Sequence, residues 1–243
     1  MNELTVNRDY NLYPEIISYD EHNPSLKSPM AEFDLPFYQT RETLMDVDVY
    51  RRFLKNAEST FRASKEYKAY KAYVMEYLGA NRCQVLGNIS SDDAPIELHH
   101  NVLGLFDICL LISSHVVNTV GIISTYDLIQ LLIMEHWENR VGLTMLSETA
   151  HQIFTNDPNG FIPPEQTFGR WWELLGRYKY GITLSIANKV MNYIKRCDSN
   201  NPVTSIILEQ QDEILNFAWM NEYGEEFNKL GFLPNYQEFK EDF

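Results

Sequence analysis

Three histidines have the types and spacing that hydrolytic chemistry could use. His99 and His100 close a segment, residues 95–100, that alternates apolar and polar residues as a short strand does. Neighbouring strand residues point to opposite faces, so the two rings are expected to diverge. His151 falls in the first turn of a predicted helix that Ser147 can cap.

A neutral imidazole can deprotonate water near pH 7, and it can also hold a divalent cation that stabilises charge on a phosphodiester. The three histidines therefore indicate phosphodiester hydrolysis as one chemistry. A structural histidine pair at the end of a strand is the alternative.

The elements that must position these histidines are two strands and a helix. The second strand is predicted at residues 141–147, and the helix that carries His151 follows it directly. Between the strands, residues 103–138 are apolar and helical, with a break near Gly121 and a cap at Ser124 or Thr125. Further helices are expected at residues 41–80, 165–178, 185–197 and 204–224. The predicted fold class is α+β, predominantly helical, with a small ββα element embedded in a helical body.

Two stretches of the sequence carry a family resemblance: IELHH at residues 96–100 and LTMLSETAHQIF at residues 143–154. Together they resemble the HNH, or His-Me finger, endonuclease superfamily, and more closely HNH-like proteins encoded by phages. The resemblance covers residues 83–160, about a third of the chain. It implies a ββα fold for residues 81–160, with residues 103–138 as a helical insertion.

The resemblance also implies roles for individual residues. His100 would be the general base, and His99 and His151 would be metal ligands. Where the family has a further ligand, four residues after His151, this chain has Thr155, and Asn156 is the substitute that we expect one residue later. Two protein ligands completed by waters suit Mg²⁺ or Mn²⁺ as the cofactor. The paired CxxC motifs of the family are missing, because the three cysteines lie far apart.

A cluster of basic residues within 41–80 is the predicted nucleic-acid contact. Arg51, Lys55, Arg62 and Lys65 share one face if that helix is continuous. They could hold the phosphates of DNA. A solvated helix face is the alternative.

The charge of the whole chain argues against DNA as the partner. The net charge is -14, and residues 203–243 contribute nine acidic residues and two lysines. Such a charge repels duplex DNA and attracts basic proteins. No stretch is long and apolar enough for a membrane span. Residues 1–40 carry four prolines and several aromatics, which predicts an extended arm that packs on the body or on a partner, with a frayed terminus as the alternative.

Two functions therefore remain open. The first is a phage-type, metal-dependent DNA endonuclease with His100 as its base. The second is an inactive module on the same scaffold, either a virion component or an acidic regulator that binds a basic protein. The partners would be DNA in the first case and a protein or the phage assembly in the second, with a homo-oligomer as a further option. The expected location is the cytoplasm of the infected host cell or the virion. The acidic helical region at residues 161–243 and the arm at residues 1–40 support the second hypothesis.

Overall fold

The computed structural model describes residues 38–157 and 160–230 of the chain. The strands are β1 (Tyr38–Thr40), β2 (Ile96–His100), β3 (Ile122–Ser124) and β4 (Leu143–Ser147). The α-helices are α3 (Arg41–Leu44), α4 (Val47–Ala63), α5 (Lys65–Ala72), α6 (Leu105–Val120), α7 (Thr125–Trp137), α8 (Glu148–Asn156), α9 (Trp171–Arg177), α10 (Leu184–Ile194) and α11 (Pro202–Leu230). A π-helical turn, η1 (Tyr73–Tyr77), continues α5, and two 3₁₀ turns are η2 (Pro164–Gln166) and η3 (Lys179–Gly181).

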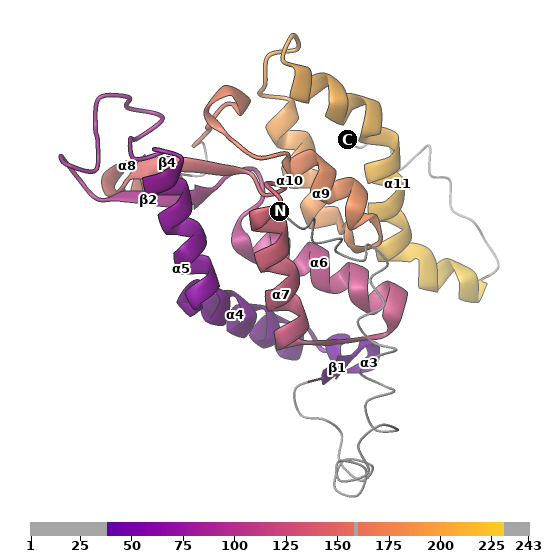
Figure 1. Ribbon diagram of the computed structural model, residues 1–243. Coiled ribbons are helices and arrows are strands. Elements are labelled where there is room, and N and C mark those ends of the chain that lie inside the picture. Colours follow the sequence, from indigo (N-terminus) through magenta and orange to yellow (C-terminus); the bar gives the residue numbers. More distant parts are fainter. Residues whose placement is uncertain (1–37, 158–159, 231–243) are drawn as a thin grey trace, which may run out of the picture.

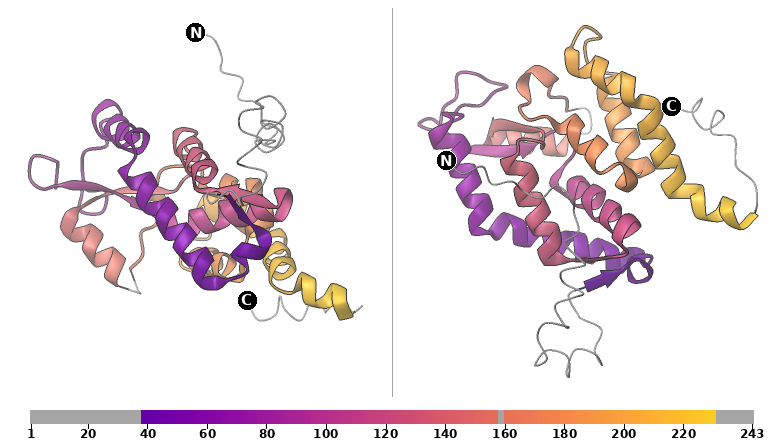
Figure 2. Two further views of the ribbon diagram at one scale, coloured as in Figure 1. Left: turned by 90° about the horizontal axis from the view of Figure 1, so that it is seen from below. Right: turned by 45° about the vertical axis from the view of Figure 1, so that its right-hand side comes forward.

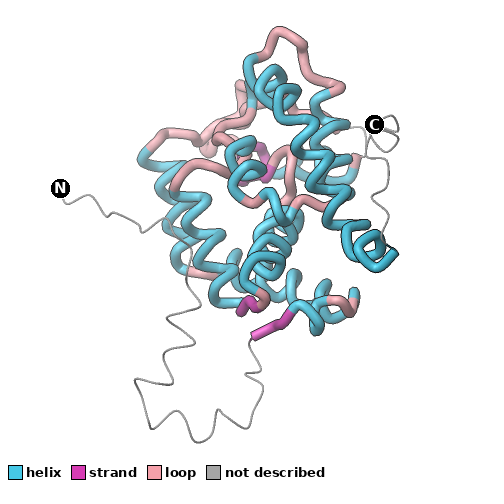
Figure 3. Tube along the Cα trace, turned by 90° about the vertical axis from the view of Figure 1, so that its right-hand side faces the viewer, coloured by secondary structure: helices cyan, strands magenta, loops and turns pink. Residues whose placement is uncertain are grey.

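Helices make up most of the described chain, and the strands are few and short (Figure 3). The predicted α+β, predominantly helical class is thereby confirmed. Both predicted strands of the ββα element are present, and β2 pairs antiparallel with β4. Ser124 and Ser147 cap α7 and α8, because their hydroxyls accept hydrogen bonds from the backbone N–H of Asp127 and Ala150.

The helical segment predicted at residues 41–80 is broken into several pieces. The main break is at Ser64, whose backbone is extended with a ψ of 153°. Its hydroxyl accepts a hydrogen bond from the N–H of Tyr67 at 3.1 Å, so Ser64 ends α4 and caps α5. The continuous helix assumed for the basic cluster was therefore wrong, and Lys65 begins a different helix from Arg51, Lys55 and Arg62.

Two further differences concern the ends of predicted elements. The helix expected over residues 165–178 begins only at Trp171, because Gly169 has a φ of 95° and interrupts it. A second two-stranded sheet, in which β1 pairs antiparallel with β3, was not predicted. The rest of the predicted arm, residues 1–37, lies outside the described residues.

One hydrophobic core runs through the described chain, from Leu44 in α3 to Ala218 in α11. Helices α4, α5 and α7 lie on one side of the molecule, and α9, α10 and α11 lie on the other (Figures 1 and 2). Helix α6 lies between the two groups and contacts α4, α7 and η3. Within the described residues, no helix is long and apolar enough to cross a membrane.

Candidate functional site

The candidate site is built on β2, β4 and α8. The ladder between the strands places His100 opposite Leu143 and Ile96 opposite Ser147. Helix α8 starts directly after β4 and packs against both strands. Side chains on β2 alternate between the core and the α8 side, as the sequence predicted, with Ile96, Leu98 and His100 buried.

Three polar side chains meet on the α8 side of the sheet. The rings of His99 and His151 are in edge contact, with their centroids 4.9 Å apart. Nδ1 of His151 contacts a carboxylate oxygen of Glu97, and both side chains are about one third exposed. The structure thus brings together two of the predicted ligands and adds Glu97, which faces the same side of β2 as His99.

His100 lies on the opposite face of the sheet, inside the core. It is 8% exposed, and its Nε2 is 3.0 Å from Nε2 of His136 in α7. His136 is 1% exposed, and its Nδ1 lies 2.7 Å from the carbonyl oxygen of Leu132, to which it donates. Nε2 of His136 is then left as an acceptor, so His100 is the donor of the bond between the two rings. The rings of Phe61 and Tyr67 also pack on His136, at centroid distances of 4.8 and 5.8 Å.

Burial makes these histidines weak bases. It lowers the pKa of His99 to about 4, with a further contribution from His151. Burial lowers the pKa of His136 to about 4, although its bond to the Leu132 carbonyl opposes the shift. The pKa of His100 falls well below its usual value of 6.5, first through burial and then through the proximity of His136. All three rings are therefore neutral near pH 7.

Asn156 lies apart from the histidines. It is exposed at the end of α8, and its amide donates to the carbonyl of Gln152 at 2.8 Å. Five residues after His151, it is turned by about 140° around the helix. The residues that the structure describes contain no cluster of three or more His, Cys, Asp or Glu side chains arranged to hold a metal ion. The donor set therefore fits a divalent cation only in part, as two imidazoles beside one carboxylate.

The basic residues predicted to contact nucleic acid are all exposed. Arg51, Lys55 and Arg62 lie on α4, and Lys65 is the first residue of α5. Arg62 forms an ion pair with Glu58 at 3.0 Å, one turn earlier in the same helix. The exposure of these residues fits either phosphate contact or a solvated helix face.

Two buried polar groups, His136 and Glu135, are not among the predicted site residues. Leu128 and Leu132, at intervals of four residues before His136, mark its helix face as apolar in the sequence. Glu135, with no exposed surface, receives a hydrogen bond of 2.7 Å from Tyr178 and forms ion pairs with Arg140 and Arg177. This network joins α7 to α9 and stabilises the body that carries β2 and β4.

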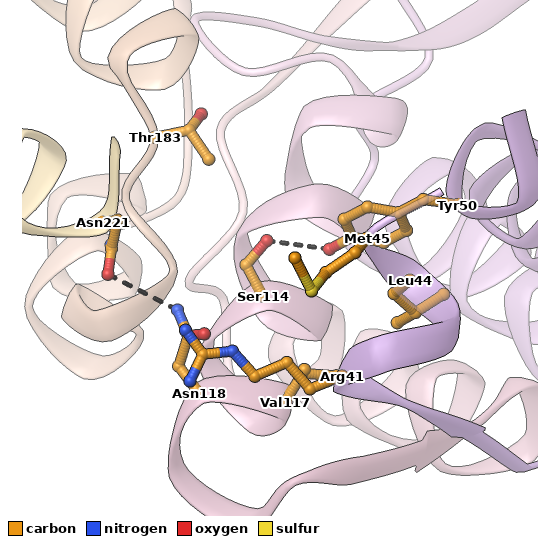
Figure 4. A pocket seen from close by; sticks show the side chains of 9 residues that line it. All are labelled: Arg41, Leu44, Met45, Tyr50, Ser114, Val117, Asn118, Thr183 and Asn221. Carbon is orange, nitrogen blue, oxygen red and sulfur yellow. Dashed lines mark hydrogen bonds between the residues drawn. The ribbon is translucent and has the colours of Figure 1, made fainter. Parts of the chain in front are cut away.

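A cleft of about 180 Å³ lies elsewhere, between α3, α6 and α11 (Figure 4). Tyr50 is hydrogen-bonded to Ser114 at 2.7 Å, and the amide of Asn118 donates to Asn221 at 3.4 Å. The amide of Asn118 also donates to the carbonyl of Tyr180 at 2.8 Å. These bonds join distant parts of the chain, so the cleft wall has a role in holding the helices together.

The comparisons with known proteins give one result that bears on function. No curated protein and no solved structure matches the chain. A family model matches residues 4–224, nearly the whole sequence, and its description is Bacteriophage G278-like virion protein. This description gives a place in the virion and no reaction, so the HNH resemblance stays a prediction. The match covers the candidate site and the helical body together, and the chain therefore belongs to the family of bacteriophage G278-like virion proteins.

Proposed function

We propose that the protein is a non-catalytic assembly component of the phage virion, in which the ββα unit serves as a structural scaffold. Membership of a virion protein family supports the location. The observation that carries the non-catalytic role is the buried bond between His100 and His136.

A general base must reach water or substrate, and its lone pair must be free to accept a proton. His100 does not meet these needs in this fold, because its ring is only 8% exposed and its Nε2 carries the proton that it donates to His136. Moving His100 toward α8 would shift the strand by one residue and turn every side chain of β2 to the wrong face. The pair is therefore better suited to fix the position of β2 against α7.

The charge of the chain indicates the class of partner. A net charge of -14 attracts basic proteins and slows approach to DNA. We propose that the partner is a basic protein of the particle, bound in part through the acidic residues of the C-terminal region.

Plasmid nicking tests the non-catalytic role. The purified full chain is incubated at low salt with Mg²⁺, Mn²⁺ or Ni²⁺, beside His99→Ala and His151→Ala. Both histidines are partly exposed, so their substitution is expected to leave the fold intact, which thermal unfolding checks. Gln152→Ala, an exposed neighbour of His151, is the matched control. We expect no metal-dependent cleavage from any of the four proteins. Cleavage by the wild type and by Gln152→Ala that both histidine variants lose would overturn the proposal.

A second candidate function is the metal-dependent DNA endonuclease, and the contact between His99 and His151 favours it. In that case the two imidazoles would hold a Mg²⁺ or Mn²⁺ ion, which would stabilise charge on the phosphate. Arg51, Lys55, Arg62 and Lys65 would contact DNA. His100 would have to leave His136 before it could act as a base, and the nicking assay separates this candidate from the first.

A further inference from the structure

An aromatic groove lies on the surface of the molecule, and His136, the partner of His100, is among the residues that line it. It has a volume of about 480 Å³ and is lined mainly by Tyr70, Tyr73, Val74, Leu78, Trp137 and Phe168. The ring of Trp137 packs against Tyr70 and Tyr73, with centroid distances of 5.3 Å to each. We call this feature the aromatic groove.

Several large apolar side chains at this groove are exposed. Trp137 is 46% exposed, Leu78 is 56% exposed and Tyr77, beside the groove, is 79% exposed. A contiguous exposed patch of this kind is a mark of a binding surface, because isolated apolar side chains are usual on a surface but clusters of aromatics are not.

The π-helical turn η1 contributes Tyr73 and Val74 to the lining of the groove. The N–H of Leu78 donates to the carbonyl of Tyr73 at 3.0 Å, five residues back, so the turn is wider than in an α-helix. The rings of Tyr73 and Tyr77, four residues apart, stack with their centroids 5.2 Å apart. Such turns inside helices occur frequently at functional sites.

The segment that forms one wall of the groove is positively charged, whereas the chain as a whole is acidic. Residues 51–82, which include one wall of the groove, carry eight basic and three acidic residues, a net charge of +5. Lys68, Lys71 and Arg82 each lie within two residues of a residue that lines the groove. The occupant is therefore expected to be acidic as well as aromatic.

The chain contains such a segment at residues 9–21, DYNLYPEIISYDE. It has three tyrosines, three aliphatic residues, four acidic residues and no basic residue. We propose that residues 9–21 dock in the aromatic groove of their own chain. This inference does not depend on the function proposed above.

The length of the chain allows this docking. Tyr38 pairs with Ser124, which caps the start of α7, and Trp137 is the last residue of the same helix. The 13 residues of α7 span about 20 Å, which about six extended residues can cover. Tyr19 is 19 residues before Tyr38, so it has ample reach. The C-terminal residues 231–243 are also acidic and aromatic, but they follow the end of α11, on the other side of the molecule from α5 (Figure 1).

Fluorescence quenching of the full chain tests the proposal. Docking covers Trp137, so the triple variant Tyr10→Ser/Tyr13→Ser/Tyr19→Ser should raise acrylamide quenching of the exposed tryptophan about twofold. The same triple change in a Trp137→Phe background should have no effect. Tyr126→Ser, an exposed tyrosine in the first turn of α7, is the matched control and should leave quenching unchanged.

The outcomes are distinguishable. Unchanged quenching in the triple variant would overturn the proposal, and so would an equal change in the Trp137→Phe background. A change that appears only as the protein concentration rises, together with a dimer in light scattering, would assign the occupant to the arm of a second copy. If the triple variant has no effect and an added acidic, aromatic peptide of another protein lowers the quenching of Trp137, the occupant of the groove is that partner and not residues 9–21.

Discussion

At the scale of single residues, the position of His100 decides how the candidate site is interpreted. Two histidines adjacent in sequence have opposite environments here: His99 faces Glu97 and His151, whereas His100 faces His136 in the core. The first ring is in a place where a ligand or substrate could approach. The second is part of the packing between β2 and α7.

The buried pair predicts a loss of stability in acid. The unfolded His136 takes up a proton near its ordinary pKa of 6.5, whereas the folded ring does so only near a pKa of about 4. Between these values the unfolded state binds more protons, so stability is complete above about pH 6.5 and is lost as pH falls. From pH 7.5 to pH 5, this effect of His136 alone amounts to about 2 kcal/mol.

Urea unfolding at a series of pH values measures this loss. In His136→Gln, a side chain that can form hydrogen bonds but does not titrate replaces the imidazole, so the decline between pH 7.5 and 5 should be smaller than in the wild type. An equal decline in the two proteins would contradict the prediction. Because His100 also has a lowered pKa, His136→Gln should retain part of the pH dependence.

At the scale of elements, the close approach of η3 to α6 depends on Gly181. A Cβ at this position would lie 1.9 Å from the carbonyl oxygen of Leu111, well inside contact distance. Helix α6 is the central helix of the fold, and its carbonyls cannot move without shifting the helix. The absence of a side chain at Gly181 therefore allows the C-terminal helices to pack on it.

We expect Gly181→Ala to destabilise the protein by about 2–4 kcal/mol, because the methyl group must displace the backbone of α6. The matched control is Gly176→Ala in α9, where a Cβ meets nothing within 4 Å. That change should stabilise the protein by about 0.5–1 kcal/mol, since alanine favours the helix. Thermal unfolding of both variants measures the difference, and equal stabilities would show that η3 can move away from α6 at little cost.

At the scale of the whole molecule, the core joins segments that look separate in the sequence. The network of Glu135, Arg140, Arg177 and Tyr178 links α7 to α9, and the same hydrophobic core extends from α4 to α11. Strands β2 and β4 and helix α8 share this core and are not an isolated domain packed on a helical body.

We therefore predict that the described body unfolds in one cooperative transition, because its two sides share buried contacts. Far-UV circular dichroism and tryptophan fluorescence should give the same midpoint in urea. Three of the four tryptophans, Trp171, Trp172 and Trp219, lie in α9 and α11, so fluorescence reports mainly on these helices, whereas circular dichroism reports on all helices. Two separated midpoints would contradict a shared core and would favour independent units at residues 41–160 and 161–243.

The local elements of this protein can be predicted from the amino-acid sequence. The alternation of residues 95–100, the caps at Ser124 and Ser147 and the break near Gly121 predicted strands and helices that the structure contains. These features depend on contacts within a few residues, so a pattern in the chain is enough to reveal them. The divergence of His99 and His100 followed in the same way from the alternation of a strand.

Which of the two histidines faces the core depends on packing between distant segments and could not be predicted from the sequence. That choice depends on a partner 36 residues away, His136, and on the packing of Phe61 and Tyr67 around it. The break at Ser64 likewise divided a basic cluster that helical periodicity had treated as one face. The buried ion pairs of Glu135 and the aromatic groove arise from contacts between distant segments. Such contacts leave no periodic signal in the chain, because their energy comes from burial and from partners that folding alone brings together.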